Sequence, residues 1–328
     1  MKRGKLPESV LIRSVLKQVK HRREEVLAGP GVGQDCAALA VGEDEAFVLS
    51  SDPITGTVQD VGSHGIYVTA NDLAASGAEP VGVLLTILLP LKTEEAELRV
   101  MMQDAERVCK ELNMEILGGH TEVTPVVCQP LLSVTGVGRV KKSALLRTSQ
   151  MKTEQDLVVT KWIGLEATAI LAKEREEELR KRFPAALVDT AKEFSGNLSV
   201  LPEARIACSH GVSAMHDITE GGIFGALWEM ASGAGVGLEV DLKKIPIRQE
   251  TVEICEYFGV NPYQIMSSGS MLIAVDDGYE LVRKLEQAGI HSAVVGRTVR
   301  GNDRILRNGE DVRYLDKPQQ DELYKIKG

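Results

Sequence analysis

The stretch from Val68 to Pro90, VTANDLAASGAEPVGVLLTILLP, predicts a helix, a turn and a strand within 23 residues. Small apolar residues recur at helical spacing in its first half, and Asn71 and Asp72 lie near the start of the predicted helix. Gly77 and Pro80 end this helix, because glycine destabilises a helix interior and proline cannot continue one. The apolar run that follows is short and ends at a proline, which favours a buried strand. The stretch therefore predicts a fold in which helices pack against a sheet.

Asp72 is the unusual residue of this stretch, because it is charged within a segment of small residues that can pack tightly. A buried carboxylate needs hydrogen-bond donors, a basic side chain or a metal ion as its partner. The alternative is an exposed acid in the first turn of the helix, where the helix dipole favours negative charge. The stretch alone leaves both interpretations open, and the other acidic and glycine-rich stretches of the same half bear on the choice.

Length and composition indicate a globular protein of about two domains, since the chain has 328 residues of which 43% are hydrophobic and 26% charged. A polar, weakly patterned stretch at 141–155 predicts the boundary between them. Only 4% of the residues are aromatic and the net charge is -9, which disfavours nucleic acid as a partner. Nucleotide binding stays open, because magnesium can mediate between carboxylates and phosphates.

Cysteine usage and hydropathy predict a cytoplasmic protein. The five cysteines are widely separated and form no Cys-x-x-Cys pair, which disfavours both a disulfide framework and a structural zinc site. Charges interrupt the apolar positions of the N-terminal segment, and no run of 18 or more apolar residues occurs. We therefore expect no signal peptide and no membrane association.

The first half offers two further acids. An amphipathic helix is predicted over 8–28, and a mobile glycine-rich loop at 29–39 contains Asp35. A short strand at 46–50 presents Asp52 at its end, where α/β folds place ligand-binding groups. The alternative for Asp52 is a simple Asp-Pro turn.

The rest of the first half supplies a helix and two strands. The 3, 4, 3, 4 spacing of apolar residues predicts a core-facing helix over 93–113 that Thr93 caps. A strand from Glu115 runs into a turn at Gly118 and Gly119 that exposes the next residues, His120 and Thr121, and another strand spans 131–140. A histidine is more often structural than a ligand, but the two glycines before this one indicate a close backbone approach.

The second half contains its own candidate ligand site. A strand is predicted to end at Ile218, Thr219 can cap the next helix, and Gly221 and Gly222 open its first turn. A helix N-terminus flanked by glycines is suited to an anion. Asp217 would repel that anion unless a cation bridges the two, or unless it binds a ribose or base donor instead. The highly charged segment 173–182 predicts a solvated helix face, and further strands and helices alternate up to residue 295.

Five motifs occur in the order found in the ATP-binding enzymes related to aminoimidazole ribonucleotide synthase, the PurM-like family. They are Gly33-Gln-Asp-Cys-Ala37, the strand-terminal Asp52, Asn71 to Pro80, Gly118-Gly-His-Thr121 and Asp217-Ile-Thr-Glu-Gly-Gly222. Each motif is weak alone, but together they resemble this family over nearly the whole chain. Within it the chain looks most like the hydrogenase maturation factors of the HypE type.

The resemblance implies an α/β (α+β) fold of two domains. Residues 1–148 would form an ATP-binding domain whose sheet pairs with its copy in a homodimer, and residues 149–328 a C-terminal α/β domain. The strand 83–89 is also too apolar for an exposed sheet edge, which favours a dimer. The alternative is that this strand is central within one subunit.

The resemblance also implies ATP and Mg²⁺ as cofactors, with ATP in the cleft between the domains. The implied metal ligands are Asp35, Asp52 and Asp72, which would be too crowded to be ionised together without cations. The implied nucleotide contacts are Gly33, Asp35, Asp52, Asn71, Asp72, Gly118, Gly119, Thr121, Asp217, Gly221 and Gly222. The implied catalytic residues are Asp72, His120 and Asp217. The shared chemistry is ATP-dependent activation of an acceptor oxygen by phosphoryl transfer.

Three departures from the family pattern bear on the reaction. Gln34 replaces the first acid of an acidic pair, and His120 stands where a carboxylate is expected. HypE-type factors end in a cysteine that carries the reacting group, whereas no cysteine follows Cys255 here. We therefore expect the polar segment 316–328 to be unburied and not the acceptor, which would be a small molecule or another protein. Two alternatives stay open: a thiamine-phosphate-kinase-like enzyme, and a nucleotide-binding regulatory protein without turnover.

Overall fold

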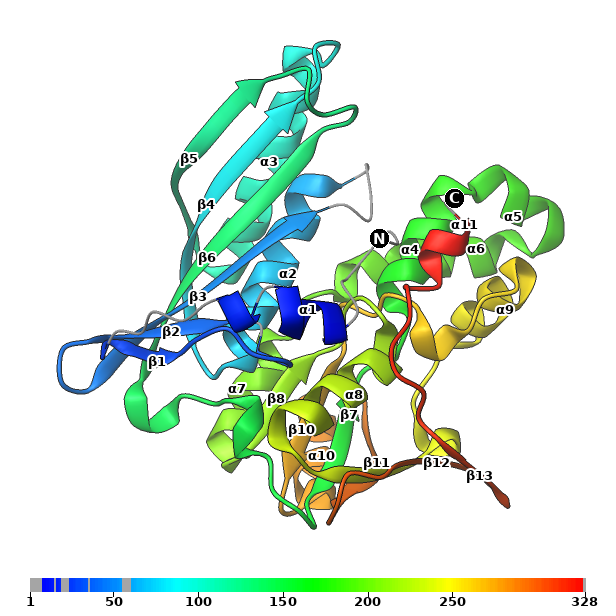
Figure 1. Ribbon diagram of the computed structural model, residues 1–328. Helices are drawn as coiled ribbons and strands as arrows, with labels where there is room; N and C mark the ends of the chain where they lie inside the picture. The colour runs from blue at the N-terminus through cyan, green and yellow to red at the C-terminus, as the bar shows by residue number, and fades with distance from the viewer. Residues whose placement is uncertain (1–7, 15, 19–23, 35, 55–59, 327–328) are drawn as a thin grey trace. The chain divides into compact units, whose positions relative to one another are not determined.

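The computed structural model describes residues 8–14, 16–18, 24–34, 36–54 and 60–326 (Figure 1). They form two compact units. The described residues of Arg22–Pro30 and Asp35–Leu145 form the smaller unit, and those of Met1–His21, Gly31–Gln34 and Leu146–Gly328 form the larger one.

The smaller unit is a sheet with helices on one face. Its strands, in sheet order among the described residues, are β1 (Val26–Ala28), β2 (Ala37–Val41), β3 (Glu45–Ile54), β6 (Leu131–Lys141), β4 (Glu79–Leu89) and β5 (Glu115–Val123). Neighbours are antiparallel except β4 and β5. Helices α2 (Val61–Ala75) and α3 (Glu95–Leu112) complete the unit, and α2 packs on β3, β6 and β4.

The central strand β4 confirms the strand predicted after Pro80 but corrects its surroundings. Val83, Leu85 and Ile87 are buried, whereas Leu84 between them is 43% exposed. The strand is therefore buried on one face, not on both. It lies between β6 and β5 within one subunit, so its apolar character does not require pairing with a second copy.

Helix α2 begins earlier than predicted and lies very close to the sheet. Because it starts at Val61, Asp72 lies near its carboxyl end and is 6% exposed. The alternative of an exposed acid in the first turn is therefore wrong. A Cβ atom on Gly136 of β6 would lie 2.3 Å from Thr69 Cγ2, so the close packing of helix on sheet depends on glycine. Gly77, with φ of +76°, follows the helix as predicted.

Several other local predictions for this half are wrong in detail. Residues 8–28 are not one helix: α1 (Glu8–Ser14) and a 3₁₀ turn, Leu16–Gln18, belong to the larger unit, and β1 starts at Val26. The glycines 118 and 119 lie inside β5 and form no turn. Asp52 and Pro53 lie inside β3, where Pro53 pairs with β6 only, as a proline requires. Glu94, not Thr93, is the N-cap of α3.

The larger unit contains a second mixed sheet. Its described strands, in sheet order, are β13 (Asp311–Tyr314), β12 (Arg304–Asn308), β9 (Gly237–Asp241), β11 (Ser292–Val299), β7 (Asp156–Thr160), β10 (Met271–Val275) and β8 (Ala214–Asp217). Only β12 and β9 pair in parallel among these neighbours. The sequence predicted the strand that ends near Ile218, here β8, and an alternation of further strands and helices up to residue 295.

Helices of the larger unit form two cores. Besides α1, its described helices are α4 (Leu165–Glu174), α5 (Glu176–Arg182), α6 (Ala185–Glu193), α7 (Leu201–His210), α8 (Gly222–Ala234), α9 (Gln249–Phe258), α10 (Gly278–Gln287) and α11 (Leu323–Ile326). Further 3₁₀ turns are Lys142–Ala144 in the smaller unit and Thr148–Gln150, Phe194–Asn197, Leu242–Lys244 and Pro262–Gln264 in the larger one. One core joins α8 to the sheet, and the other joins α4, α6 and α9 to α11.

Two predictions for the second half need correction. The charged segment 173–182, predicted as one helix face, is divided at Arg175 between α4 and α5, and Glu176 and Arg180 of α5 form an ion pair at 2.8 Å. The expectation of an unburied tail is wrong for residues 321–324, of which Leu323 and Tyr324 are 0% and 4% exposed within the second core, whereas Asp316 is exposed. No helix among the described residues is long and apolar enough to cross a membrane.

Candidate functional site

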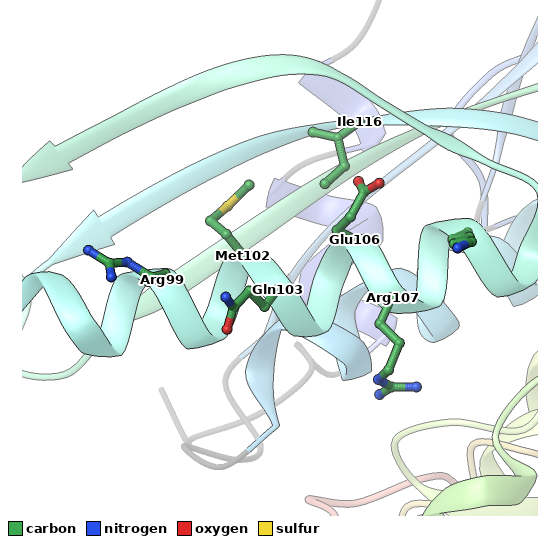
Figure 2. A pocket seen from close by; sticks show the side chains of 7 residues that line it. Arg99, Met102, Gln103, Glu106, Arg107 and Ile116 are labelled. Atoms are coloured by element: carbon green, nitrogen blue, oxygen red, sulfur yellow. The ribbon is translucent and has the colours of Figure 1, made fainter.

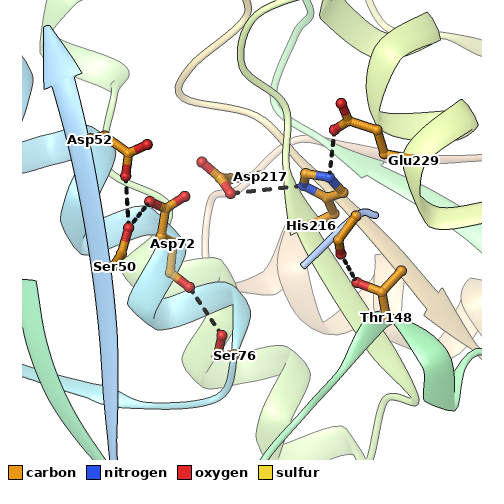
Figure 3. Close-up of polar contacts among 9 residues, drawn as sticks. Ser50, Asp52, Asp72, Ser76, Thr148, His216, Asp217 and Glu229 are labelled. Atoms are coloured by element: carbon orange, nitrogen blue, oxygen red, sulfur yellow. Dashed lines mark hydrogen bonds and ion pairs between the residues drawn. The ribbon is translucent and has the colours of Figure 1, made fainter. Parts of the chain in front are cut away.

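Two of the three predicted metal ligands meet at one serine in the smaller unit. Ser50 Oγ lies 2.7 Å from Asp52 Oδ2 and 2.5 Å from Asp72 Oδ2 (Figure 3). Ser50 and Asp52 are on β3, on the face that α2 covers, and Asp72 comes from α2 itself. The close contact of α2 with Gly136, the β6 partner of Ser50, brings the helix carboxylate to the strand.

The shared hydroxyl leaves a deficit of hydrogens between the carboxylates. A serine hydroxyl carries one hydrogen, so Ser50 can donate to Asp52 or to Asp72 but not to both. The other contact then brings two oxygen atoms together without a hydrogen between them. A carboxylate near the carboxyl end of a helix also faces the negative end of the helix dipole. Both effects favour a cation beside this pair.

The donor set of this site fits a hard cation. Carboxylate and hydroxyl oxygens are the ligand types that Mg²⁺ takes together with phosphate oxygens. Asp35, the third predicted ligand, lies outside the described residues. Among the side chains that the structure describes, no group of three acids, histidines or cysteines is arranged to hold a metal, so the described site consists of Asp52 and Asp72 alone. Asn71, which precedes Asp72 in α2, is fully buried.

The predicted residues of β5 lie away from this pair. Thr121 and His120 are exposed, and β5 is separated from β3 by β4 and β6, or about 14 Å at the usual strand spacing. His120 pairs with Thr86, which faces away from the helices, and its Nε2 lies 3.4 Å from Glu122 Oε2. Gly119 is required by packing, since a Cβ there would lie 1.9 Å from Leu85 O.

A groove of ≈ 540 Å³ lies between α3 and β5 (Figure 2). Its lining is Arg99, Met102, Gln103, Glu106, Arg107, Lys110 and Ile116. Arg99 and Arg107 form exposed ion pairs with Glu95 and Glu111 of the same helix. The groove contains none of the predicted site residues.

In the larger unit the predicted residues gather at the start of α8. Asp217 ends β8 and is 1% exposed, and its Oδ2 has no hydrogen-bond partner among the described residues. Gly221, with φ of +89°, is the N-cap in place of the predicted Thr219. Its N–H donates to Asp321 Oδ2 at 2.6 Å, and the N–H of Gly222 donates to Thr219 O at 3.1 Å. The chain itself therefore occupies the two amides that were predicted to bind an anion.

Behind Asp217 lies a histidine that the sequence reasoning missed. His216 is 3% exposed, and its Nε2 lies 3.1 Å from Glu229 Oε2 of α8 (Figure 3). Its Nδ1 lies 3.9 Å from Asp217 Oδ1, so the imidazole stands between two carboxylates. The dipeptide His216-Asp217 was the one sequence feature that could have indicated this histidine. Its partner Glu229 is thirteen residues away and forms no local sequence pattern with the dipeptide.

Gly33 is held against the same helix. A Cβ at Gly33, whose φ is +66°, would lie 2.5 Å from Glu229 O, so only glycine fits. Its carbonyl accepts a hydrogen bond from Thr148 Oγ1 at 2.5 Å. The predicted glycine-rich loop is therefore fixed at this residue by contacts within the larger unit.

Family comparison accounts for both units. The N-terminal domain of the AIR synthase related protein family matches residues 33–140, and the C-terminal domain of that family matches residues 152–307. A putative hydrogenase expression/formation protein of Methanocaldococcus jannaschii is 26% identical over 281 residues, or 83% of this chain and 80% of the relative. The carbamoyl dehydratase HypE of Rhodobacter capsulatus is 28% identical over 282 residues, or 84% of this chain and 78% of the relative.

Solved structures share the fold. A chain of the HypE–HypF complex superposes with a TM-score of 0.77 at 17% identity, covering 94% of this chain and 99% of the other. AaThiL with AMPPCP and TMP superposes with a TM-score of 0.73 at 18% identity, covering 96% of this chain and 98% of that one. HypE with ATP superposes with a TM-score of 0.72 at 17% identity, covering 96% of this chain and 95% of that one. With both domain matches spanning most of the sequence, the chain belongs to the AIR synthase related protein family and has its two-domain PurM-like fold.

Proposed function

We propose that this chain is a Mg-ATP-dependent enzyme that transfers the γ-phosphoryl group of ATP to an oxygen of an acceptor. The observation that supports this most is the convergence of Asp52 and Asp72 on the single hydroxyl of Ser50. A cation bound there would be held by both carboxylates and would attract the phosphate oxygens of a nucleotide. Two solved structures with the same fold, HypE with ATP and AaThiL with AMPPCP, support a nucleotide as the ligand.

The roles follow from the residues. Asp52 and Asp72, with Asp35 as a third candidate, would hold Mg²⁺, which when bound neutralises charge on the phosphates. In the transfer, the bond between the γ-phosphorus and the bridging oxygen of ADP breaks, and a bond from the acceptor oxygen to that phosphorus forms. Asp72, His120 and Asp217 stay the candidates for catalysis. Gly33, Asn71, Gly118, Gly119, Thr121, Gly221 and Gly222 stay candidates for nucleotide contacts.

For the acceptor we propose another protein or a small molecule, in the context of hydrogenase maturation. The relatives named as a hydrogenase expression/formation protein and as carbamoyl dehydratase support this context, and the complex of HypE with HypF supports a protein partner. The chain's own tail is a poor acceptor, because residues 316–328 contain no cysteine and Tyr324 and Asp321 are buried.

One alternative has an observation in its favour. The structure of AaThiL with TMP covers this chain as completely as HypE with ATP does, which keeps a thiamine-phosphate-kinase-like activity in view. Production of ADP that depends on added thiamine phosphate would favour it. The second alternative, a regulatory nucleotide-binding protein, predicts that Mg-ATP binds but no ADP is released.

A homodimer through the smaller unit is also proposed, on a different ground from the one that the sequence offered. The sheet face opposite α2 carries the exposed apolar side chains of Leu39, Val41, Phe47 and Leu84, which are 36–43% exposed. A second copy of the same face would cover them.

The test of the proposed function is the melting temperature with and without Mg-ATP. Binding at 100 times the dissociation constant stabilises a protein by about 2.7 kcal/mol. Asp52→Asn and Asp72→Asn should lose most of this shift while the ligand-free variants stay folded, because an asparagine amide can donate to the Ser50 oxygen. Asp44→Asn, an exposed acid of the same unit, is the matched control. An unchanged shift in both site variants would reject the assignment.

A further inference from the structure

The carboxyl-terminal segment 321–326 packs into the larger unit as part of its core. Leu323 and Tyr324 lie with side chains of α4, α6 and α9, and α11 occupies this place in Figure 1. The buried thiol of Cys255 on α9 belongs to the same cluster. Release of this segment would therefore uncover Cys255.

Asp321 anchors the segment to the start of α8. The side chain is 1% exposed, and its Oδ2 accepts the Gly221 N–H at 2.6 Å. Its Oδ1 accepts the Leu323 N–H at 2.9 Å. The amino terminus of a 13-residue helix favours negative charge, and this is the place where an anionic group of a ligand would bind. The chain places its own carboxylate there.

The anchor is surrounded by other acids. Glu166 on α4 and Glu220 before α8 both act on Asp321 electrostatically. Glu322 follows it, pairing with Lys325 at 2.5 Å and accepting the Asn261 N–H at 3.3 Å. Tyr324 OH donates to Glu220 Oε2 at 3.4 Å. On α9, Cys255 has its pKa raised to about 12 by burial and then by Glu322 and Asp321.

These surroundings change the ionisation of Asp321. Burial, with smaller contributions from Glu220 and Glu166, raises the pKa of its carboxyl to about 7, against the lowering effect of the Gly221 and Leu323 hydrogen bonds. An ionised Asp321 is therefore less favourable in the packed segment than in water.

We propose that residues 321–326 are a releasable latch on helix α8, in which Asp321 takes the place of an anionic ligand group. The latch is firm while Asp321 is protonated and loosens when it ionises or when an inorganic phosphate group takes the Gly221 amide. The second part rests on the proposed function, because it treats Gly221 as a ligand contact.

The direction of the pH effect follows from linkage. The Asp321 pKa is about 7 in the packed segment and near the ordinary value of 3.8 when it is released. The packed form therefore binds the Asp321 proton more tightly than the released form. The stability that this proton gives to the packed form is fully present below the lower pKa. It falls as pH rises between the two values and levels off above 7.

Cys255 can report the release of the latch, with Cys109 as an internal control. Both thiols are 1% exposed, and burial raises the pKa of Cys109 to about 11. Cys109 lies on α3 in the smaller unit, whereas the latch belongs to the larger one. At pH values below both thiol pKa values, the thiolate fractions of Cys255 and Cys109 change with pH in parallel. The ratio of their rates of labelling by 4,4′-dithiodipyridine is therefore independent of thiol ionisation. Peptide mapping separates them from the exposed Cys128 and Cys208.

The ratio of Cys255 to Cys109 labelling should rise tenfold or more between pH 5 and pH 7.5. In Asp321→Asn it should change less than twofold, because no carboxyl titrates there. Asp316→Asn, on an exposed acid five residues earlier, should behave like the unaltered protein. Hydrogen exchange of the Leu323 amide over the same pH series is the second readout. A flat ratio in the unaltered protein, or an undiminished rise in Asp321→Asn, would overturn the latch.

Inorganic phosphate at pH 6 should raise the ratio at least threefold over sodium chloride of equal ionic strength. No change would reject the competition at Gly221 and leave the segment as a fixed cap. The Mg-ATP melting shift, measured on the same protein, tests the proposed function separately. Loss of that shift with an intact pH response would reject the function and keep the pH-sensitive latch.

Discussion

Lys161 and Glu203 form a buried ion pair in the larger unit, with Nζ 2.6 Å from Oε1 and side chains 12% and 1% exposed. Lys161 follows β7 in a left-handed conformation, with φ of +52°, and also donates to Ser199 O. Burial lowers the pKa of the Lys161 ammonium, and the Glu203 carboxylate opposes that shift. The pair connects the end of β7 to helix α7, and the Glu203 carboxylate is shielded from water.

Replacing one partner of this pair should destabilise the protein more than replacing both partners. Glu203→Gln leaves the ammonium buried without a counter-charge, which typically costs about 3–5 kcal/mol. The double variant Lys161→Met with Glu203→Leu should regain at least half of that loss, since no charge stays buried. Urea unfolding of the two single variants and the double variant measures the coupling. Strictly additive losses would contradict the ion pair.

Gly136→Ala should destabilise the smaller unit, because the new methyl group would overlap Thr69 on α2. Overpacking of this kind typically costs about 1–3 kcal/mol. Gly196→Ala is the control, because no atom lies within 4 Å of the added Cβ and its φ is not positive. Thermal unfolding compares the two, and equal melting temperatures would show that α2 can move away from β6.

Phe47→Glu should disrupt the proposed homodimer by placing a charge on the open sheet face. Sedimentation at micromolar concentration should show a dimer for the unaltered protein and a shift toward monomer for this variant. Val126→Glu, in an 80% exposed position of the same unit, should leave the dimer intact. A monomer at this concentration before any substitution would reject the dimer.

Leu323→Ala should lower the stability of the larger unit by about 2–5 kcal/mol, as for other fully buried leucines. This replaces the expectation that the polar tail is unburied. Leu91→Ala, at a 69% exposed leucine, provides the comparison. If urea unfolding gave the same midpoint for both variants, the packing of α11 would contribute nothing to stability.

The sequence predicted the helix-turn-strand around Asp72 but not where its helix begins. Helix α2 is buried nearly all round, so it has no polar face and no amphipathic stripe to mark its extent. Glycines also weaken the helical signal of its first turns. The structure gives one of them, Gly62, a reason: a Cβ there would lie 2.1 Å from Met101 O of α3.

Only those residues of the candidate site that belong to recognisable sequence motifs could be predicted. The acids Asp52 and Asp72 stood out because charge is unusual among apolar neighbours, whereas Ser50 is an ordinary residue whose role depends on where α2 lies. His216 and Asp321 acquire their roles from Glu229 and Gly221, which are distant in sequence. A polar tail gives no local sign that Leu323 will be buried. The boundary between residues 148 and 149 stays a prediction.

The attachment of Gly33 has a consequence for dividing the protein. Residues 31–34 belong to the larger unit although the segments on either side of them, up to Pro30 and from Asp35, belong to the smaller one. Glu8 is likewise tied to Trp228, whose Nε1 donates to it at 2.8 Å. No single cut therefore separates the units: a fragment that starts at residue 146 would lack both attachments to α8. Independent expression of the larger unit would need these pieces rejoined by a new linker or supplied as a separate peptide.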